Sequence, residues 1–165
     1  MKDQIIMHVR DFDPKKAVFN LKVGSINKKP ISALWSCDDE EELKNSAWIE
    51  WCRYNDYTIK DHLSIFKVIP KKDVKVLDID EPNDVYKLPY TENPVVGKHF
   101  DYEKIAEEYD GVRFGWGAVL IGKLHNGEYP DWITGSMYWM DCASTVWFNN
   151  EWIENYTYIK EFEEV

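Results

Sequence analysis

The chain has 165 residues and a net charge of −10, and its length suits one globular domain covering residues 1–165. The 30 acidic residues outnumber the 20 basic ones, which disfavours attraction to phosphate backbones, so we expect no nucleic-acid groove. The amino terminus is too charged for a signal peptide, and no apolar run is long enough to span a bilayer. These features predict a soluble protein that does not associate with membranes.

The cysteines and aromatic residues narrow the class further. Three cysteines without CxxC spacing predict neither a disulfide framework nor a zinc cluster, and they indicate reduced thiols in a cytoplasmic protein. The chain carries eight Trp, ten Tyr and seven Phe residues, more than an average core requires. These rings either pack a sheet against helices or line a pocket or partner surface.

The first half of the chain predicts strands around one helix. A strand is expected at residues 4–9, an irregular segment at 15–30 and an apolar strand at 31–37. Acidic residues from Asp38 to Glu42 favour a helix start, and apolar side chains at helical spacing extend the predicted helix to about Tyr54.

The second half mixes strands and short helices without regular βαβ alternation. It predicts strands at 62–69, 72–79 and 156–162, helices at 83–88 and 102–109, a loop at 89–97, a turn-rich connection at 125–131 and a β-prone stretch at 137–148. Residues 112–124 hold three glycines in a β-like run, so a strand, a bulge and an exposed hairpin remain open. We therefore predict an α+β fold with mixed, mostly antiparallel sheets and a few short flanking helices.

Common catalytic signatures do not occur in the sequence. There is no P-loop, no GxGxxG after a strand, no HExxH and no GxSxG. Four histidines lie far apart in the sequence without ligand-type spacing, so only tertiary folding could assemble a metal site from them.

Five short segments, taken together and in order, resemble the NAD-using ADP-ribosyltransferase superfamily. The resemblance covers most of the chain and rests on IIMHVRD, LWSCDDEE, VKVLDI, YDGV and STVWFNNEWI. It implies an ADP-ribosyltransferase-like fold that uses NAD as a substrate. It also implies cofactor-binding roles for His8 or Arg10, on the ribose or phosphates of the adenosine side, and for Trp35 with Ser36 beside the nicotinamide half.

The resemblance departs from the family at the catalytic carboxylate. Aligning VWFNNEWI with the family's late strand places the catalytic glutamate position on Ser144 or Thr145, and neither side chain can supply a negative charge. A carboxylate near the ribose would stabilise an oxocarbenium-like transition state. Asp141 is the nearest upstream carboxylate. It either replaces the missing catalytic glutamate or is an ordinary aspartate that is solvated or caps a turn. On an ideal strand Asp141 would face away from Ser144.

Two functions from different classes follow. The first is an ADP-ribosyltransferase-like protein that binds NAD or an ADP-ribose-containing nucleotide and transfers ADP-ribose to a macromolecular target. The second is a non-catalytic protein of phage or mobile-element origin that binds a host protein through an aromatic face. A structure with Asp141 in a cleft beside Ser36 and His8 would favour the first function. A structure with exposed Trp side chains and no carboxylate in the cleft would favour the second function.

Overall fold

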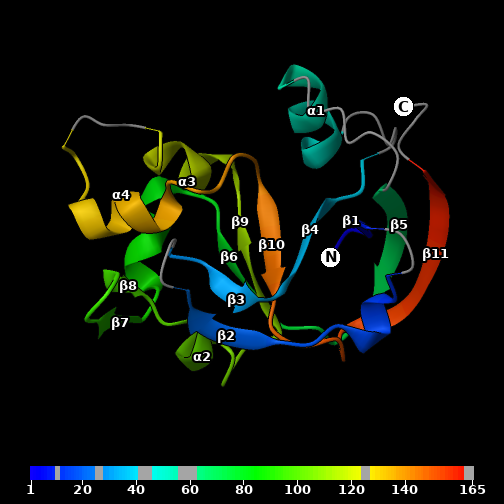
Figure 1. Ribbon diagram of the computed structural model, residues 1–165, viewed down its shortest axis with the longest axis horizontal. Coiled ribbons are helices and arrows are strands. Elements are labelled where there is room, and N and C mark those ends of the chain that lie inside the picture. The colour runs from blue at the N-terminus through cyan, green and yellow to red at the C-terminus, as the bar shows by residue number, and fades with distance from the viewer. Residues whose placement is uncertain (10–11, 25–27, 41–45, 56–62, 124–126, 162–165) are drawn as a thin grey trace.

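The fold is described by a computed structural model for residues 1–9, 12–24, 28–40, 46–55, 63–123 and 127–161. Its main strands are β1 (Gln4–Val9), β4 (Leu34–Asp38), β5 (Leu63–Pro70), β6 (Val76–Ile79), β9 (Gly111–Phe114), β10 (Ser144–Trp147) and β11 (Ile153–Glu161). They form a seven-stranded sheet in the order β11-β5-β1-β4-β10-β9-β6 (Figure 1). Neighbours are antiparallel except for β6 and β9, which are parallel.

Two small hairpins and several short helices surround this sheet. The hairpins pair β2 (Asn20–Val23) with β3 (Pro30–Ser32) and β7 (Tyr90–Asn93) with β8 (Gly97–Phe100). The helices are α1 (Ala47–Tyr54), α2 (Tyr102–Ile105), α3 (Trp116–Ile121) and α4 (Asp131–Met137), with the 3-10 turns η1 (Pro14–Lys16) and η3 (Pro82–Lys87). Within the described ranges, no helix is long and apolar enough to cross a membrane.

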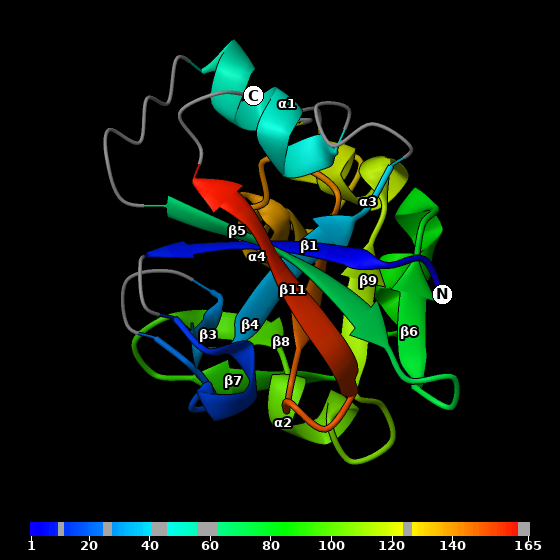
Figure 2. The same ribbon diagram turned by 90° about the vertical axis from the view of Figure 1, so that its right-hand side faces the viewer.

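The sheet is strongly twisted, and its two halves meet at a short junction between β1 and β4. Figure 2 shows β11 and β5 running across the direction of β9 and β6. Only Gln4 with Asp38 and Ile5 with Cys37 are paired across β1 and β4, whereas β1 pairs with β5 along its whole length. The strand ends beside this junction consequently diverge and leave room for a cleft.

Apolar side chains cover both faces of the sheet. On one face, Val112, Phe114 and Val146 pack against residues of α3 and α4. On the other face, Trp147 and its neighbours form a second cluster. A third, smaller cluster joins α1 to the sheet through Ile49 and the buried side chains of β1, β4 and β5. Each such side chain contributes about 1.5–3 kcal/mol on burial, so the clusters hold the helices against the sheet.

The α+β class, the mostly antiparallel sheets and the short helices are confirmed, but several predicted boundaries were wrong. The predicted helix start at Asp38 is incorrect because Asp38 pairs with Gln4 as the last residue of β4. The helix α1 begins at Ala47, and residues 41–45 lie outside the described part of the chain. The predicted strand at 72–79 is ordered as a strand only from Val76, and the predicted helix at 102–109 is α-helical only to Ile105.

Tertiary contacts also changed three segments of the second half. The predicted loop at 89–97 contains strand β7, which pairs with β8 across a turn where Gly97 has a φ of 70°. The glycine-rich run 112–124 is a short strand followed by helix α3. Helix α4 begins at Asp131, the last residue of the predicted turn, and ends at Met137, the first residue of the predicted β-prone stretch. It forms because its buried Ile133 and Met137 pack into the main core.

Candidate functional site

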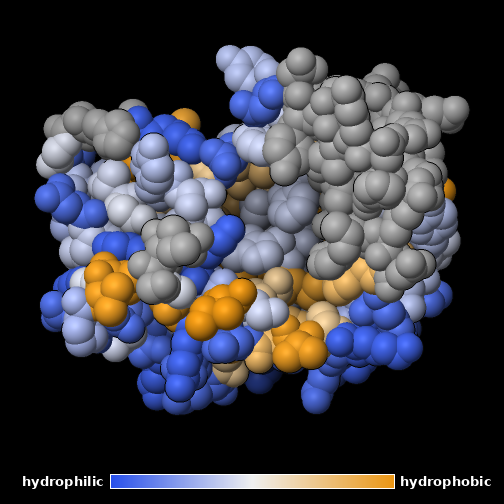
Figure 3. All heavy atoms as spheres, viewed as in Figure 1, coloured by the Kyte–Doolittle hydropathy of each residue, from blue (hydrophilic) through white to orange (hydrophobic). Residues whose placement is uncertain are grey.

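A cleft of about 370 Å³ lies at the strand ends beside the β1–β4 junction. Strands β4, β6 and β9 finish there, β10 starts there, and α1 and the first turn of α3 form opposite walls. Figure 3 shows the surface hollowed between the α3 side of the molecule and α1. Its lining includes Lys2, Asp38, Glu40, Ala47, Glu50, Asp80, Arg113, Gly115, Trp116, Ala143, Ser144 and Thr145.

Strand register explains why side chains distant in the sequence meet at this cleft. In the sheet, Arg113 is paired with Asp78 on one side and with Thr145 on the other. Because paired residues share a face, these side chains form one row across β6, β9 and β10. The parallel arrangement of β6 and β9 also brings their carboxyl ends, Asp80 and Gly115, to the same edge.

Gly115 is required by the packing of Asp80. A Cβ atom at position 115 would lie 1.8 Å from Asp80 Oδ1 and 3.2 Å from Asp80 Cα. Any other residue would therefore force the Asp80 carboxylate to move away, with a smaller shift of the Asp80 backbone. The glycine thus fixes the wall of the cleft where β9 turns into α3.

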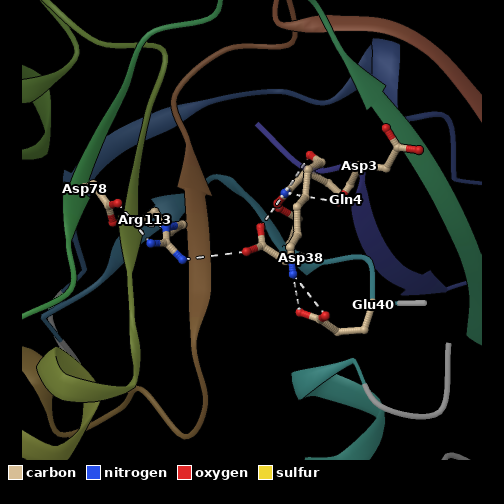
Figure 4. A network of polar contacts seen from close by, with 8 residues as sticks. Asp3, Gln4, Asp38, Glu40, Asp78 and Arg113 are labelled. Carbon is tan, nitrogen blue, oxygen red and sulfur yellow. Dashed lines mark hydrogen bonds and ion pairs between the residues drawn. The ribbon is translucent and has the colours of Figure 1, made fainter. Parts of the chain in front are cut away.

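A continuous chain of polar contacts runs from the buried sheet to the cleft. Trp147 Nε1 donates to Ser36 Oγ over 2.7 Å, and Ser36 Oγ donates to Gln4 Oε1 over 2.6 Å. Gln4 Nε2 then donates to Asp38 Oδ1 over 2.7 Å. Figure 4 shows Asp38 between Gln4 and Arg113, whose Nη1 lies 3.6 Å from Asp38 Oδ2. The orientation of Asp38 is therefore set from the core.

The guanidinium of Arg113 is held mainly by Asp78. Its Nε and Nη2 atoms donate to the two carboxylate oxygens of Asp78 over 3.0 and 2.9 Å. This hydrogen bonding raises the pKa of Arg113 above its ordinary value, against the opposing effect of burial. At the other side of the cleft, Lys2 donates to Glu40, which raises the pKa of Lys2. Both cations lining the cleft are thus already paired with carboxylates.

The cleft retains an excess of negative charge. Among its described lining residues, the carboxylates Asp38, Glu40, Glu50 and Asp80 face only Lys2 and Arg113. Within the described ranges, neither Glu50 nor Asp80 forms an ion pair. An electropositive group would be favoured beside them, since carboxylates stabilise nearby positive charge.

A second, shallower groove of about 620 Å³ continues from the cleft between α1 and α3. Ala47, Glu50 and Trp116 line both hollows, so the two form one connected surface. The groove adds two aromatic side chains of α1 and the carboxylate of Asp141.

The two predicted catalytic residues lie in different parts of this surface. Ser144 lines the cleft, where its hydroxyl accepts a hydrogen bond from Trp48 Nε1 over 2.9 Å and donates to the Cys142 carbonyl over 3.0 Å. Asp141 lines the groove instead, with its carboxylate 2.8 Å from Lys123 Nζ. The structure places Asp141 in a hollow that adjoins the cleft of Ser144.

The predicted cofactor-binding residues are not gathered into one pocket. Ser36 is fully buried, and its hydroxyl is occupied by Gln4 and Trp147. Trp35 lies on the opposite face, where it packs edge-to-face on Trp139 with centroids 4.7 Å apart. His8 lies in β1, paired in register with Ser64 of β5, and Arg10 lies outside the described residues.

Several residues of the cleft were not found by sequence reasoning. Arg113 and Lys123 are the two charged residues of the apolar, glycine-rich run that follows YDG, and a charge at position 113, within the predicted β-like run, could have drawn attention to Arg113. Glu50 is one of many acidic residues on a predicted helix, so nothing in the sequence distinguished it. Trp116 lies between Gly115 and Gly117, and as one of eight Trp residues it carried no distinguishing signal.

The cysteines show no sign of nucleophilic activation. Cys37, Cys52 and Cys142 are all free and buried. Burial raises the pKa of Cys37 to about 12 and that of Cys142 to about 11, so both remain neutral thiols. No group of three or more metal-ligating side chains is present in the described part of the chain.

Comparison of this chain with family models, curated proteins and solved structures found no match.

Proposed function

We propose that this chain is an ADP-ribosyltransferase-like protein, which binds NAD or another ADP-ribose-containing nucleotide in the cleft and transfers ADP-ribose to a macromolecular target. One observation carries the proposal. The five segments that resemble the ADP-ribosyltransferase superfamily contribute to β1, β4, β6, β9 and β10, and these strands are consecutive neighbours in the order β1-β4-β10-β9-β6. Segments spread over most of the sequence thus converge on one part of the sheet, and the cleft lies at their ends.

The charge of the cleft suits the nicotinamide half of NAD. The nicotinamide ring carries a positive charge, which Glu50 and Asp80 would stabilise, and the exposed ring of Trp116 offers a surface on which it can stack. The pyrophosphate would lie towards Arg113 and Lys2, where charge-assisted hydrogen bonds require it to displace the carboxylates of Asp78 and Glu40. Of the residues that the resemblance assigns to the nucleotide, Ser36 would act on it only through Gln4 and Asp38, which link the buried hydroxyl to the cleft.

The reaction requires negative charge near the ribose. The bond between nicotinamide and ribose C1′ breaks, nicotinamide leaves with the bonding electrons, and the acceptor attacks C1′ and loses its proton. An oxocarbenium-like charge develops on the ribose during this step, and a nearby carboxylate stabilises it. Glu50 lines the same cleft as Ser144, and Asp141 lies in the adjoining groove, so either can replace the glutamate absent at Ser144.

Calorimetric titration of the purified protein with NAD tests the proposal without knowledge of the acceptor. We expect saturable binding at micromolar to millimolar concentrations, with slow release of nicotinamide detected by chromatography. Glu50→Gln or Asp141→Asn should lower nicotinamide release by about 10²-fold or more if that carboxylate stabilises the transition state. Glu92→Gln, on the exposed strand β7, is the matched control and should leave release unchanged.

Ser36→Ala separates a positioning role from a purely structural one, because the buried hydroxyl reaches the cleft only through Gln4 and Asp38. A positioning role should weaken NAD binding even under conditions where the variant is fully folded, whereas a purely structural hydroxyl should lower only the melting temperature. Absence of both heat and a melting-temperature shift at millimolar NAD in the unmodified protein would refute the proposal.

The second candidate function is a non-catalytic protein that binds a host protein. The observation that favours it is the exposure of aromatic side chains beside the cleft, where Trp116 is 52% and Tyr54 is 91% exposed. Pull-down from a host extract with the Trp116→Ala variant as control would test this alternative. A partner retained by the unmodified protein and lost by the variant would favour it.

A further inference from the structure

We propose that the groove between α1 and α3 binds an arginine-containing basic segment of a partner protein. This inference goes beyond nucleotide binding, because it assigns a partner protein to the groove. The groove shares Glu50 and Trp116 with the cleft, so NAD and a bound peptide would compete for these two side chains. Its lining consists of Ala47, Glu50, Trp51, Tyr54, Trp116 and Asp141.

Aromatic rings on two facing helices form the walls of the groove. On α1, Ala47, Glu50 and Tyr54 recur at a spacing of three and four residues, so they share the face that lines the groove. Trp116, the first residue of α3, lines the opposite side. A guanidinium stacks favourably on the face of such rings, more so than on aliphatic side chains.

The carboxylates of the groove determine that the partner segment should carry positive charge. Glu50 lines the groove on α1 together with Trp51 and Tyr54, and it has no ion pair among the described residues. Asp141, on the other side, has a half-exposed carboxylate 2.8 Å from Lys123. The net charge of −10 adds attraction over a longer range. An arginine can stack on Trp116 and hydrogen-bond to Glu50 at once, because its planar fork matches a carboxylate.

The connection to the cleft favours an extended segment with more than one basic residue. The groove and the cleft share Ala47, Glu50 and Trp116. A segment lying in the groove could therefore place a second cationic side chain near Asp80, which also lacks an ion pair within the described ranges. An acidic segment would be repelled at both positions.

Fluorescence anisotropy with a labelled peptide of alternating glycine and arginine tests this inference on the full chain without NAD. We expect saturable binding that weakens as salt is added, since the contacts are largely electrostatic. Trp116→Ala and Glu50→Gln should each raise the Kd at least about fivefold, the equivalent of one exposed cation–π or charged contact.

Matched variants keep the result interpretable. Tyr86→Ala removes an aromatic ring of similar exposure outside the groove, and Glu92→Gln removes an exposed carboxylate on β7; both should leave the Kd unchanged. Equal binding of a glycine–glutamate or glycine–lysine peptide, or equal losses in the control variants, would overturn the inference. A separate NAD titration of the same samples shows whether the nucleotide proposal holds, so the two can fail independently.

Discussion

The two ends of strand β10 show how one strand can serve packing at one end and a polar cleft at the other. At its carboxyl end, Trp147 stacks on Trp152 with ring centroids 3.7 Å apart and an interplanar angle of 9°. Among the described residues, the buried Trp152 Nε1 has no hydrogen-bond partner, so Trp152 is held there mainly by ring packing. At its amino end, Ser144 is tied to Trp48 and borders a cleft lined by carboxylates. We therefore expect the Trp147 end to contribute most to stability, and the Ser144 end borders the cleft in which we propose binding.

The largest expected effect comes from removing the ring at the packed end. Trp147→Ala should lower the free energy of unfolding by about 3–5 kcal/mol, because it leaves a cavity beside Trp152 and removes the hydrogen bond to Ser36. Urea denaturation followed by circular dichroism measures this loss. Trp116→Ala, at the cleft end, is the matched control and should change stability by less than about 0.5 kcal/mol. Equal losses in the two variants would contradict the proposed division between the ends.

An intermediate effect is expected at the glycine that forms the cleft wall. Gly115→Ala should cost about 1–3 kcal/mol, because the new methyl group would overlap the Asp80 carboxylate and shift its backbone. Gly24→Ala is the control, since a Cβ there would meet only Ile31 Cγ1 at 3.7 Å. Thermal unfolding of both variants checks the difference. An unchanged melting temperature for Gly115→Ala would show that Asp80 does not pack as described.

The smallest expected effect concerns pH and the thiols beneath the cleft. Burial raises the pKa of Cys37 from an ordinary 9.0 to about 12, so the folded chain favours the neutral thiol. The stability that comes from keeping this thiol neutral is fully present below pH 9. It decreases as pH rises from 9 towards 12, because the thiol then ionises in the unfolded chain but not in the folded chain. The free energy of unfolding should fall by up to about 1.4 kcal/mol per pH unit for this thiol. Urea titrations between pH 8 and 10 should show a shallower decline in Cys37→Ala, and identical slopes would contradict the assignment.

The sequence predicted the fold class better than its boundaries. Alternating and apolar runs placed strands near β1, β4, β5 and β11, because local patterning decides which segments can pair in a sheet. It failed where tertiary contacts outweighed local preference. The acidic residues after Cys37 favoured a helix start, yet Asp38 is held in the sheet by Gln4 and Arg113.

The candidate site, like the fold, was predicted only in part from the sequence. Sequence resemblance directed attention to Ser144 and Asp141, and both line the connected surface between α1 and α3. The sequence could not show that the Ser36 hydroxyl is hydrogen-bonded to Gln4 and Trp147, because those partners lie 32 and 111 residues away. Glu50 and Arg113 were missed for the same reason, since their significance depends on strand register and helix placement.

By itself, the sequence determined the acidic charge, the mixture of strands and short helices, and the order of the segments that resemble ADP-ribosyltransferases. These properties follow from composition and short-range patterning. The tertiary structure alone decided that those segments become adjacent strands, that β1 and β4 meet over a short junction, and that carboxylates and Trp116 gather at the resulting cleft. The physical reason is that strand pairing and core packing join residues far apart in the chain, and local sequence carries no record of which partners will meet.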